Sequence, residues 1–554
     1  MPNGAKAMMR TLANAGVTVC FTNPGTSEMH FVAALDSVPE MRAVLCLFEG
    51  VATGAADGYA RMADRPAATL LHLGCGLGNG LANLHNARKA RVPVINVVGD
   101  HATFHVQYDA QLQSDIETVA RNVSPGFVRT SRTTAQLCRD VLDAVTAAAG
   151  PPGQVATLIV PADVSWGEGA VAEPAPQISA FYPAADDAAV LAIASTIAAG
   201  GRNALLLGGT ALRETALLAA ARIAARCGIK IFAETFPARM ERGAGMPSIE
   251  RIAYLAEMAA VQLNGIDNLI LVDAKAPVSF FAYPQKRSYL VPAGCKVHML
   301  STFTQDAAVS LEKLCKVIDA DQAVPRLVVG SRPSRPRGKR LTAEKVCKAV
   351  GHLLPDNAIV VDEAISSGLM LGAFTEGAPR HDLITLTGGA IGQGLPNALG
   401  AAIACPDRRV LALIGDGASM YTFQTLWTLA RENLNVTAII FNNASYAVLN
   451  LELERVGADN VGSKAKAQLD LSGPVLNFAH LAAGMGVHGV RATSTEEFMH
   501  ALEHALATPG PHVIEAMVPP TLAGLRLRLL PHILGSLEHM PLAIARMLKR
   551  KIAP

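Results

Sequence analysis

The sequence is poor in aromatic side chains, in charge and in long apolar runs. Aromatic residues make up 5% of its 554 residues and charged residues 17%, with a formal net charge of +2. No basic face stands out, so nucleic-acid binding has no electrostatic support. No uninterrupted apolar run reaches the roughly 18 residues of a membrane span, and the N-terminus lacks a signal-peptide core. We therefore expect a cytoplasmic protein that binds a small molecule.

The spacing of the cysteines indicates neither disulfide pairs nor a metal site. The nine cysteines are scattered singly from Cys20 to Cys405, with no CxxC pair and no Cys/His cluster at metal-ligand spacing. An odd count argues against a complete disulfide framework. We expect buried thiols in a reducing compartment.

The remaining composition is typical of buried parallel sheets covered by helices. Half of the residues are hydrophobic, and short apolar runs alternate with helical patterns along the chain. This alternation predicts βαβ units with right-handed connections. The expected strands cover residues 17–21, 43–48, 68–73, 92–98, 155–160, 203–209, 229–235, 268–274, 296–300, 358–363, 383–389, 410–417, 436–443 and 512–518.

Two stretches without periodicity, 166–186 and 329–340, divide the chain. We predict an α/β protein of three doubly wound parallel-sheet domains and a tail, with bounds 1–170, 185–330, 340–520 and 521–554. Leu and Ile mix with Arg and Lys in the tail. Such a pattern fits either a docked pair of short helices or a segment that binds a membrane surface or a partner.

Polar residues end two neighbouring strands of the third domain. Asp416 follows one apolar run, and Asn443 ends the next, 27 positions later. The carboxyl ends of parallel strands share one edge of a sheet, so the two side chains can meet. Gly415 and Gly417 let backbone approach an anion. A lone GDG is more often a surface turn, but its combination with NN predicts a Mg²⁺ and diphosphate site.

At this point residues 415–443, "GDGASMYTFQTLWTLARENLNVTAIIFNN", resemble a known cofactor motif. It is that of the thiamine diphosphate enzymes of the acetolactate synthase, pyruvate oxidase and benzoylformate decarboxylase group, and the other motifs are closest to benzoylformate decarboxylase. The resemblance implies that Asp416, Asn443 and the backbone oxygen of Ser445 bind Mg²⁺. It further implies that the cofactor contacts Gly415, Gly417 and Ala418.

The resemblance also implies a glutamate at a strand end of the first domain. Glu49 stands there and would hydrogen-bond N1′ of the aminopyrimidine; an N-terminal helix carboxylate explains it equally well by itself. In "LTGGAIGQGLPNALGAA", 386–402, Gly389 would hold the pyrimidine amino group and Ile391 would force the cofactor into its V shape. Ser366 and Ser367 would either point toward the diphosphate or cap a helix.

The substrate side is implied by "NPGTSE", 23–28, and "LLHLGCGLGNGLANL", 70–84. Thr26 matches a serine that holds the substrate carboxylate, and His72 a histidine that relays protons. Gln113 matches a glutamine that lines the site. Residues 276–286 lack the second catalytic histidine of benzoylformate decarboxylase. The pocket is expected to contain also Phe280, Phe281, Val448 and Leu449, with Tyr283 beside them.

The resemblance implies a lyase, a decarboxylase and carboligase of 2-oxo acids that acts through a C2 ylide and an enamine on thiamine diphosphate with Mg²⁺. An aldehyde or ketone is the expected acceptor in carboligation. Two alternatives stay open: an acetolactate-synthase-like transferase, with FAD in the middle domain, and a homologue that binds the cofactor without turnover. No flavin signature is evident in the sequence. Because the glutamate and the metal motif lie in different domains, the family pairs them across an obligate homodimer, often within a homotetramer.

Overall fold

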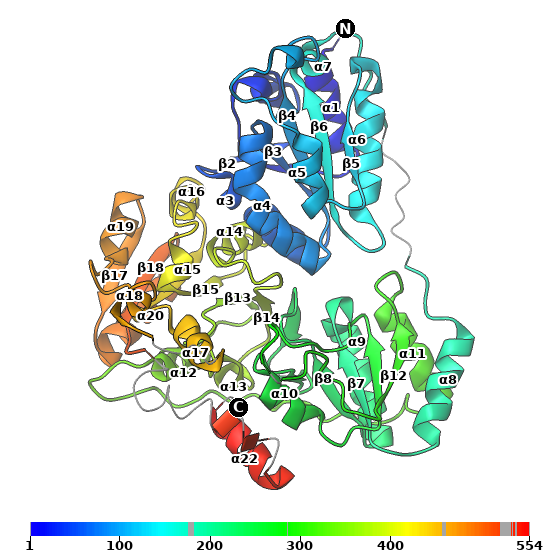
Figure 1. Ribbon diagram of the computed structural model, residues 1–554, viewed down its shortest axis with the longest axis vertical. Coiled ribbons are helices and arrows are strands. Elements are labelled where there is room, and N and C mark those ends of the chain that lie inside the picture. The colour runs from blue at the N-terminus through cyan, green and yellow to red at the C-terminus, as the bar shows by residue number, and fades with distance from the viewer. Residues whose placement is uncertain are drawn as a thin grey trace.

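The computed structural model describes residues 2–174, 182–284, 286–456, 461–520, 533–534, 536–537 and 540–552. The described residues form three sheets with helices around them, as predicted (Figure 1). In that view the first domain lies at the top, the central domain at the lower right and the third domain at the lower left. No helix within the described ranges has both the length and the apolarity that a bilayer crossing needs. The first part of the predicted tail, 521–532, lies outside the described residues.

The first domain contains a sheet of six parallel strands. Their spatial order is β2 (Arg42–Leu45), β1 (Val19–Asn23), β3 (Ala67–Leu71), β4 (Val94–Asp100), β6 (Val155–Pro161) and β5 (Val128–Thr130). The helices are α1 (Gly4–Asn14), η1 (Thr26–Glu28), α2 (Met29–Ala34), η2 (Leu35–Ser37), α3 (Glu49–Ala63), α4 (Leu73–Ala90), η3 (Val106–Tyr108), α5 (Ile116–Val123), α6 (Thr134–Ala149) and α7 (Ala162–Trp166). Successive residues of β3 enter different cores: Leu70 packs with the α1 and α6 side chains, and Leu71 with those of α3 and α4. Burial on both faces explains why the central strand β3 is almost entirely apolar.

The central domain has a smaller parallel sheet. Its strands are, in order, β10 (Glu250–Arg251), β8 (Lys230–Ala233), β7 (Asn203–Leu207), β11 (Asn268–Val272) and β12 (Lys296–Ser301). Its helices are α8 (Asp187–Ala198), η4 (Gly209–Leu212), α9 (Glu214–Cys227), α10 (Ala256–Leu263) and α11 (Ala307–Val317).

The third domain has seven strands, and one of them comes from the middle of the chain. The order is β17 (His488–Ala492), β18 (His512–Met517), β16 (Val436–Asn442), β15 (Val410–Gly415), β13 (Ala358–Glu363), β14 (His381–Thr385) and β9 (Met240–Arg242). Only the edge strand β9 runs antiparallel to its neighbour. The helices are α12 (Ala343–Leu353), α13 (Leu371–Thr375), α14 (Gly394–Ala404), α15 (Asp416–Ser419), α16 (Thr425–Arg431), α17 (Ala447–Arg455), α18 (Ser463–Ala467), α19 (Phe478–Gly484) and α20 (Thr495–Ala507).

Helices α3 and α14 join the first and third domains through small residues. A side chain at Gly58 would collide with the backbone of Asn397, and one at Gly400 would collide with the backbone of Ala55. Glycine therefore permits backbone-to-backbone approach of the two helices. A single hydrophobic core runs from the first sheet across these helices into the third sheet.

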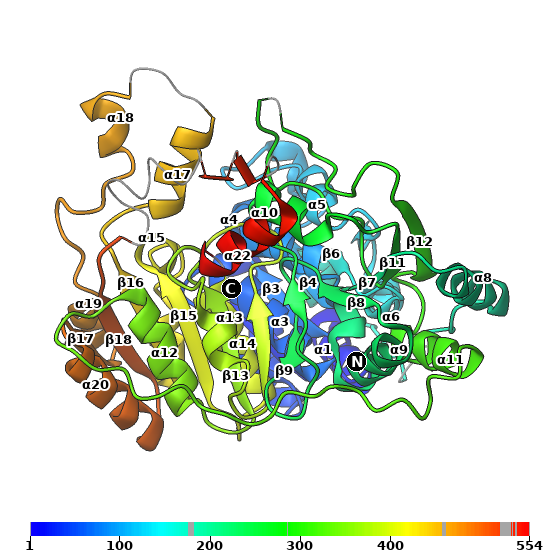
Figure 2. The ribbon, with the colours of Figure 1, turned by 90° about the horizontal axis from the view of Figure 1, so that it is seen from below.

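The described end of the chain is a helix docked on the central domain. Helix α22 (Leu542–Ile552) lies against α10, as Figure 2 shows. Leu534, Leu537 and Ala545 are buried there with Met258 and Val261 of α10.

Candidate functional site

Asp416 joins the carboxyl ends of two strands. It is buried at the start of α15, directly after β15. Its Oδ2 accepts the backbone N–H groups of Asn443, at 3.0 Å, and Ala444, at 2.7 Å, which follow β16. Its Oδ1 accepts the N–H of Gly417 at 2.8 Å. Burial raises the pKa of Asp416, and these backbone N–H groups lower it.

The oxygen atoms expected to bind a metal lie in this same loop. Asn443 is buried, and its Oδ1 accepts the N–H of Ser445 at 2.9 Å. Ala444 between them adopts the left-handed conformation, with φ of 54°, which turns the loop back on itself. The carboxylate, the amide oxygen and the backbone carbonyl are hard oxygen donors, so the set fits Mg²⁺.

The glycines of this turn have different surroundings. A side chain at Gly417 would collide with the Tyr446 ring, whereas no atom of the described residues would lie within 4 Å of a side-chain carbon at Gly415. Ala418 is buried next to them in α15. The turn is therefore closed on one side by Tyr446 and open at Gly415.

Ser366 and Ser367 follow β13 at the same edge of the sheet. Neither caps helix α13, because the N-cap residue of that helix is Met370, so the capping alternative is wrong for this helix. Ser366 is partly exposed, and Ser367 is buried, with its backbone oxygen accepting a hydrogen bond from Cys347.

The glycine-rich loop before α14 is held by side chains of the first domain and of its own domain. Asn83 and Asn86 of α4 donate to the backbone oxygens of Gly392, at 3.3 Å, and Ala390, at 2.8 Å. The buried carboxylate of Glu363 accepts the N–H groups of residues 392–394, the last of which begins α14. These contacts fix the loop that contains Gly389 and the partly buried Ile391.

Gly389 lies directly against the aromatic side chain predicted for the pocket. Its φ of 77° is in the left-handed region, and an added side chain would collide with the Phe280 ring. Phe280 in turn packs against Phe281, with ring centroids 5.0 Å apart, and against Phe236 and Tyr254. The loop expected to hold the pyrimidine thus adjoins an aromatic cluster of the central domain.

Tyr283, predicted beside these aromatic residues, makes mainly polar contacts. Its hydroxyl donates to Glu452 at 2.6 Å, and the Arg455 guanidinium lies 4.0 Å from its ring centroid. Arg455 is almost fully buried and also pairs with Glu257 of α10 at 3.0 Å. The network connects the central domain to α17, which contains the partly buried Val448 and the exposed Leu449.

Glu49 begins helix α3 and is buried, as its place at a strand end predicts. Its Oε2 accepts a hydrogen bond from Asn79 of α4 at 3.0 Å. A side-chain carbon at Gly76 would lie 3.2 Å from Oε1, so α4 approaches the carboxylate closely only because glycine stands there. The carboxylate is held in a narrow polar niche between two helices.

His72 is paired with a buried carboxylate that the sequence motif did not single out. His72 Nδ1 lies 2.8 Å from Oε2 of Glu28, whose side chain is fully buried. Burial is the largest influence on Glu28 and raises its pKa, against the lowering effects of the Gly25 N–H and of His72. A side chain at Gly25 would collide with the His72 ring, and Thr26 follows as an exposed residue.

Gln113 precedes Ser114, which contacts the N-terminus of the same helix. Ser114 contacts Gly74 closely enough that any side chain at Gly74 would collide with the Ser114 hydroxyl. Gly74 lies two positions after His72, the N-cap residue of α4. Gln113 Oε1 is buried and has no hydrogen-bond partner within the described ranges. The structure therefore brings Gln113 into the neighbourhood of His72.

The loop after β7, residues 208–213, is where the central domain would bind a nucleotide, but it does not fit a dinucleotide diphosphate. The N–H groups of Gly209 and Thr210 already donate to the carboxylates of Glu234, at 2.9 Å, and Asp273, at 2.7 Å. Arg91 of the first domain pairs with Asp273 at 2.9 Å and covers Phe303. Two carboxylates at the amides that would bind phosphate repel an anionic ligand, so these residues do not support FAD.

Two groups of polar side chains thus lie at strand ends of these parallel sheets: the loop of Asp416, Asn443 and Ser445, and the pair of Glu28 and His72. This arrangement is typical of α/β enzymes that bind a cofactor. Residues 2–120 match the family described as "Thiamine pyrophosphate enzyme, N-terminal TPP binding domain". Residues 368–516 match the family described as "Thiamine pyrophosphate enzyme, C-terminal TPP binding domain". The chain belongs to the thiamine diphosphate-dependent enzymes of the acetolactate synthase and benzoylformate decarboxylase group.

Relatives support the same conclusion. A Mycobacterium tuberculosis protein named "Putative acetolactate synthase large subunit IlvX" is 54% identical over 525 residues, covering 93% of this chain and 99% of the relative. Benzoylformate decarboxylase of Pseudomonas aeruginosa is 29% identical, covering 92% and 97% of the two chains. The structure of a 4-hydroxybenzoylformate decarboxylase of Rhodococcus jostii shares the fold, with a TM-score of 0.82 and 23% identity over 94% of this chain and 99% of that one.

Proposed function

We propose that this chain is a decarboxylase and carboligase of 2-oxo acids that uses thiamine diphosphate and Mg²⁺. The observation that carries the proposal is the Glu28–His72 pair beside Thr26, because it provides proton transfer where the substrate motifs meet. Both families of relatives named above, the acetolactate synthase and the benzoylformate decarboxylase, are compatible with this chemistry.

Asp416, Asn443 and the carbonyl of Ser445 would hold Mg²⁺, with water and the diphosphate as the remaining ligands. The bound cofactor supplies a nucleophilic carbon and a positively charged ring that accepts electrons. Glu49 would hold a proton at the pyrimidine ring, in the niche that Asn79 and Gly76 form around its carboxylate.

His72 and Glu28 would hold one proton between them next to the reacting carbonyl. Because Nδ1 of His72 is engaged by Glu28, Nε2 is the nitrogen left for the substrate. Thr26 would orient the substrate carboxylate by its hydroxyl. The aromatic cluster around Phe280 would exclude water from the pocket and bind the apolar part of the substrate.

The central domain favours joining of two carbonyl compounds over release of an aldehyde. Residues 276–286 lack the second histidine found in benzoylformate decarboxylase, and Phe280 lies against the cofactor loop instead. A pocket with one proton donor fewer protonates the intermediate less readily, so an aldehyde or ketone acceptor competes better. The 54% identity to a protein named as an acetolactate synthase subunit makes a synthase-like transferase the second candidate.

We further propose a homodimer in which each active site combines residues of both subunits. Glu49 of one subunit would face the loop of Asp416, Asn443 and Ser445 (the metal loop) of the other. A homotetramer would be the larger assembly. Co-expression of Glu49→Gln and Asp416→Ala subunits tests this arrangement. If sites are shared, mixed dimers contain one intact site of two, and the preparation recovers about a quarter of wild-type activity. Sites built within single chains would recover none.

The reaction is tested by incubating the protein with thiamine diphosphate, Mg²⁺ and a panel of 2-oxo acids, with and without acceptor aldehydes. Released CO₂ and organic products are measured together, and Glu49→Gln serves as the control. We expect CO₂ release that depends on Glu49, with coupled hydroxyketone products when acceptor is present. If no substrate releases CO₂ or gives a coupled product, the proposed function is wrong.

A further inference from the structure

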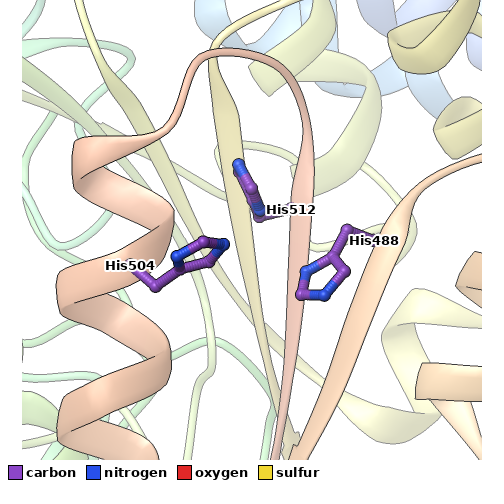
Figure 3. Close-up of side chains that lie close together, drawn as sticks. All are labelled: His488, His504 and His512. Carbon is purple, nitrogen blue, oxygen red and sulfur yellow. The ribbon is translucent and has the colours of Figure 1, made fainter.

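Three histidines that are distant in sequence meet at the edge of the third sheet opposite the metal loop. His488 begins β17, His512 begins β18, and His504 lies in the last turn of α20, the helix that precedes β18 (Figure 3). One ring nitrogen of each lies within 4.8 Å of a ring nitrogen of the other two. The ring centroids are 5.7 to 5.8 Å apart, and the rings are steeply inclined to one another.

The buried member of the trio has a free nitrogen. His512 is 6% exposed, and its Nε2 lies 3.3 Å from the carbonyl oxygen of Thr508. Because a carbonyl only accepts, the proton must be on Nε2, and Nδ1 carries the lone pair. Across the described parts of the chain, no donor reaches this Nδ1. A histidine that donates one N–H to a carbonyl and presents its other nitrogen bare has the arrangement of a metal ligand.

The charges around the trio are mixed. The carboxyl end of α20 directs its negative dipole end toward the site, which favours a cation. Arg409 is the cationic neighbour. Burial is the largest influence on His512 and lowers its pKa, and Arg409 acts in the same direction. The Arg409 guanidinium donates hydrogen bonds to the Thr508 carbonyl and to Asn435 Oδ1, so protein acceptors already engage it.

We propose that His488, His504 and His512 form a Zn²⁺ site, with water as the fourth ligand. Imidazole nitrogens are the preferred ligands of Zn²⁺ besides thiolates. Tetrahedral coordination at the usual Zn–N distance puts nitrogens about 3.4 Å apart. His488 and His504 are exposed, so their side chains can rotate to close the remaining gap around the fixed His512.

Zinc at this place would fasten β17, α20 and β18 together without touching the cofactor. The metal loop lies at the carboxyl end of β16, and His512 begins the parallel strand β18 next to it. A strand of this length separates the two edges by about 20 Å. The inference is therefore independent of the proposed reaction.

Isothermal titration of untagged, chelator-treated protein with ZnCl₂ tests the site. Saturating thiamine diphosphate and Mg²⁺ are present, so that the cofactor site is occupied. We expect one Zn²⁺ per chain and an affinity reduced at least about 10-fold in His488→Asn and in His504→Asn. His500→Asn is the matched control, because His500 is an exposed histidine of the same helix that pairs with Glu496.

Cobalt provides a second measurement. Co²⁺ bound by three imidazoles gives visible absorption bands, which should appear in the wild type and in His500→Asn and be absent in His504→Asn. Circular dichroism checks that each variant is folded. The proposal is overturned if the two variants bind Zn²⁺ as tightly as the wild type does, or if folded wild-type protein takes up no Zn²⁺ at micromolar concentration.

Discussion

The substitution Glu28→Gln tests whether activity depends on the negative charge of the carboxylate that is hydrogen-bonded to His72. Oε2 of Glu28 lies 2.8 Å from both the Gly25 nitrogen and His72 Nδ1, and an amide oxygen can keep both contacts. Hydrogen bonds to a charged group contribute about 1.5–3 kcal/mol and neutral ones about 0.5–1.5 kcal/mol, so the contact with His72 alone is weakened by roughly 1–1.5 kcal/mol. We expect kcat/KM to fall about tenfold for a loss of this size.

The pH profile separates this role from a structural one. The pKa of Glu28 is raised by burial, so activity of the wild type should fall as pH decreases through this raised pKa and the carboxylate becomes neutral. In Glu28→Gln that acid limb should disappear. Glu40→Gln, an exposed glutamate paired with Arg10 in the same domain, is the control. An unchanged kcat/KM and an unchanged acid limb in Glu28→Gln would refute the proposed pairing.

Three further changes probe the metal loop, the helix contact and the core. Asp416→Asn should weaken Mg²⁺-dependent binding of thiamine diphosphate in calorimetry about 10- to 100-fold, because it removes a charged ligand; Asp407→Asn, an exposed residue before β15, should not. Gly58→Ala should lower the free energy of unfolding by about 1–3 kcal/mol in urea titrations, because its methyl group meets the Asn397 backbone. Burial lowers the pKa of His381 to about 4. At this residue the folded state thus binds fewer protons than the unfolded state as the pH falls through 6.5. The contribution of His381 to the free energy of unfolding should therefore drop by about 2 kcal/mol from pH 7.5 to pH 5. Urea titrations of His381→Gln should show a smaller drop, and an equal drop in both proteins would contradict this prediction.

The sequence predicts the three sheets because their central strands are apolar on both faces. The strands it misses are short or polar: β5 has three residues, β10 has two, and β17 mixes His, Gly and Arg among its five. Such segments have too few residues, or too few apolar ones, for a strand pattern of hydrophobicity to be recognised. Strand β9 also could not be foreseen, since it leaves the central stretch to pair with β14 across more than a hundred residues.

Part of the site follows from sequence for a simple geometric reason. Asp416 and Asn443 end parallel neighbours, and strand ends converge wherever the sheet is built correctly. Contacts that depend on how separate elements pack, between domains or within one domain, do not follow in this way. Tyr283 is bonded to Glu452 from a segment far along the chain, and Glu28 resembles a solvated loop residue until β3 brings His72 to it. A carboxylate two residues after a predicted substrate contact was the available signal for Glu28.

The histidine trio illustrates the same limit. Its members lie 16 and 8 positions apart and belong to three elements. No metal-binding spacing applies to them, and only the pairing of β17 with β18 sets His488 beside His512.

The network of Tyr283, Glu452, Arg455 and Glu257 has a consequence for how this enzyme can be diversified. Helix α17 begins two residues after Ser445 and is attached to the central domain by this network. The attachment fixes the position of the metal loop relative to the aromatic cluster around Phe280. A chimera that receives a foreign central domain would remove Glu257 and Tyr283, so that buried Arg455 and Glu452 keep only their contact with each other. Exchange of substrate preference between relatives should therefore succeed only when the central domain and α17 are transplanted as one unit.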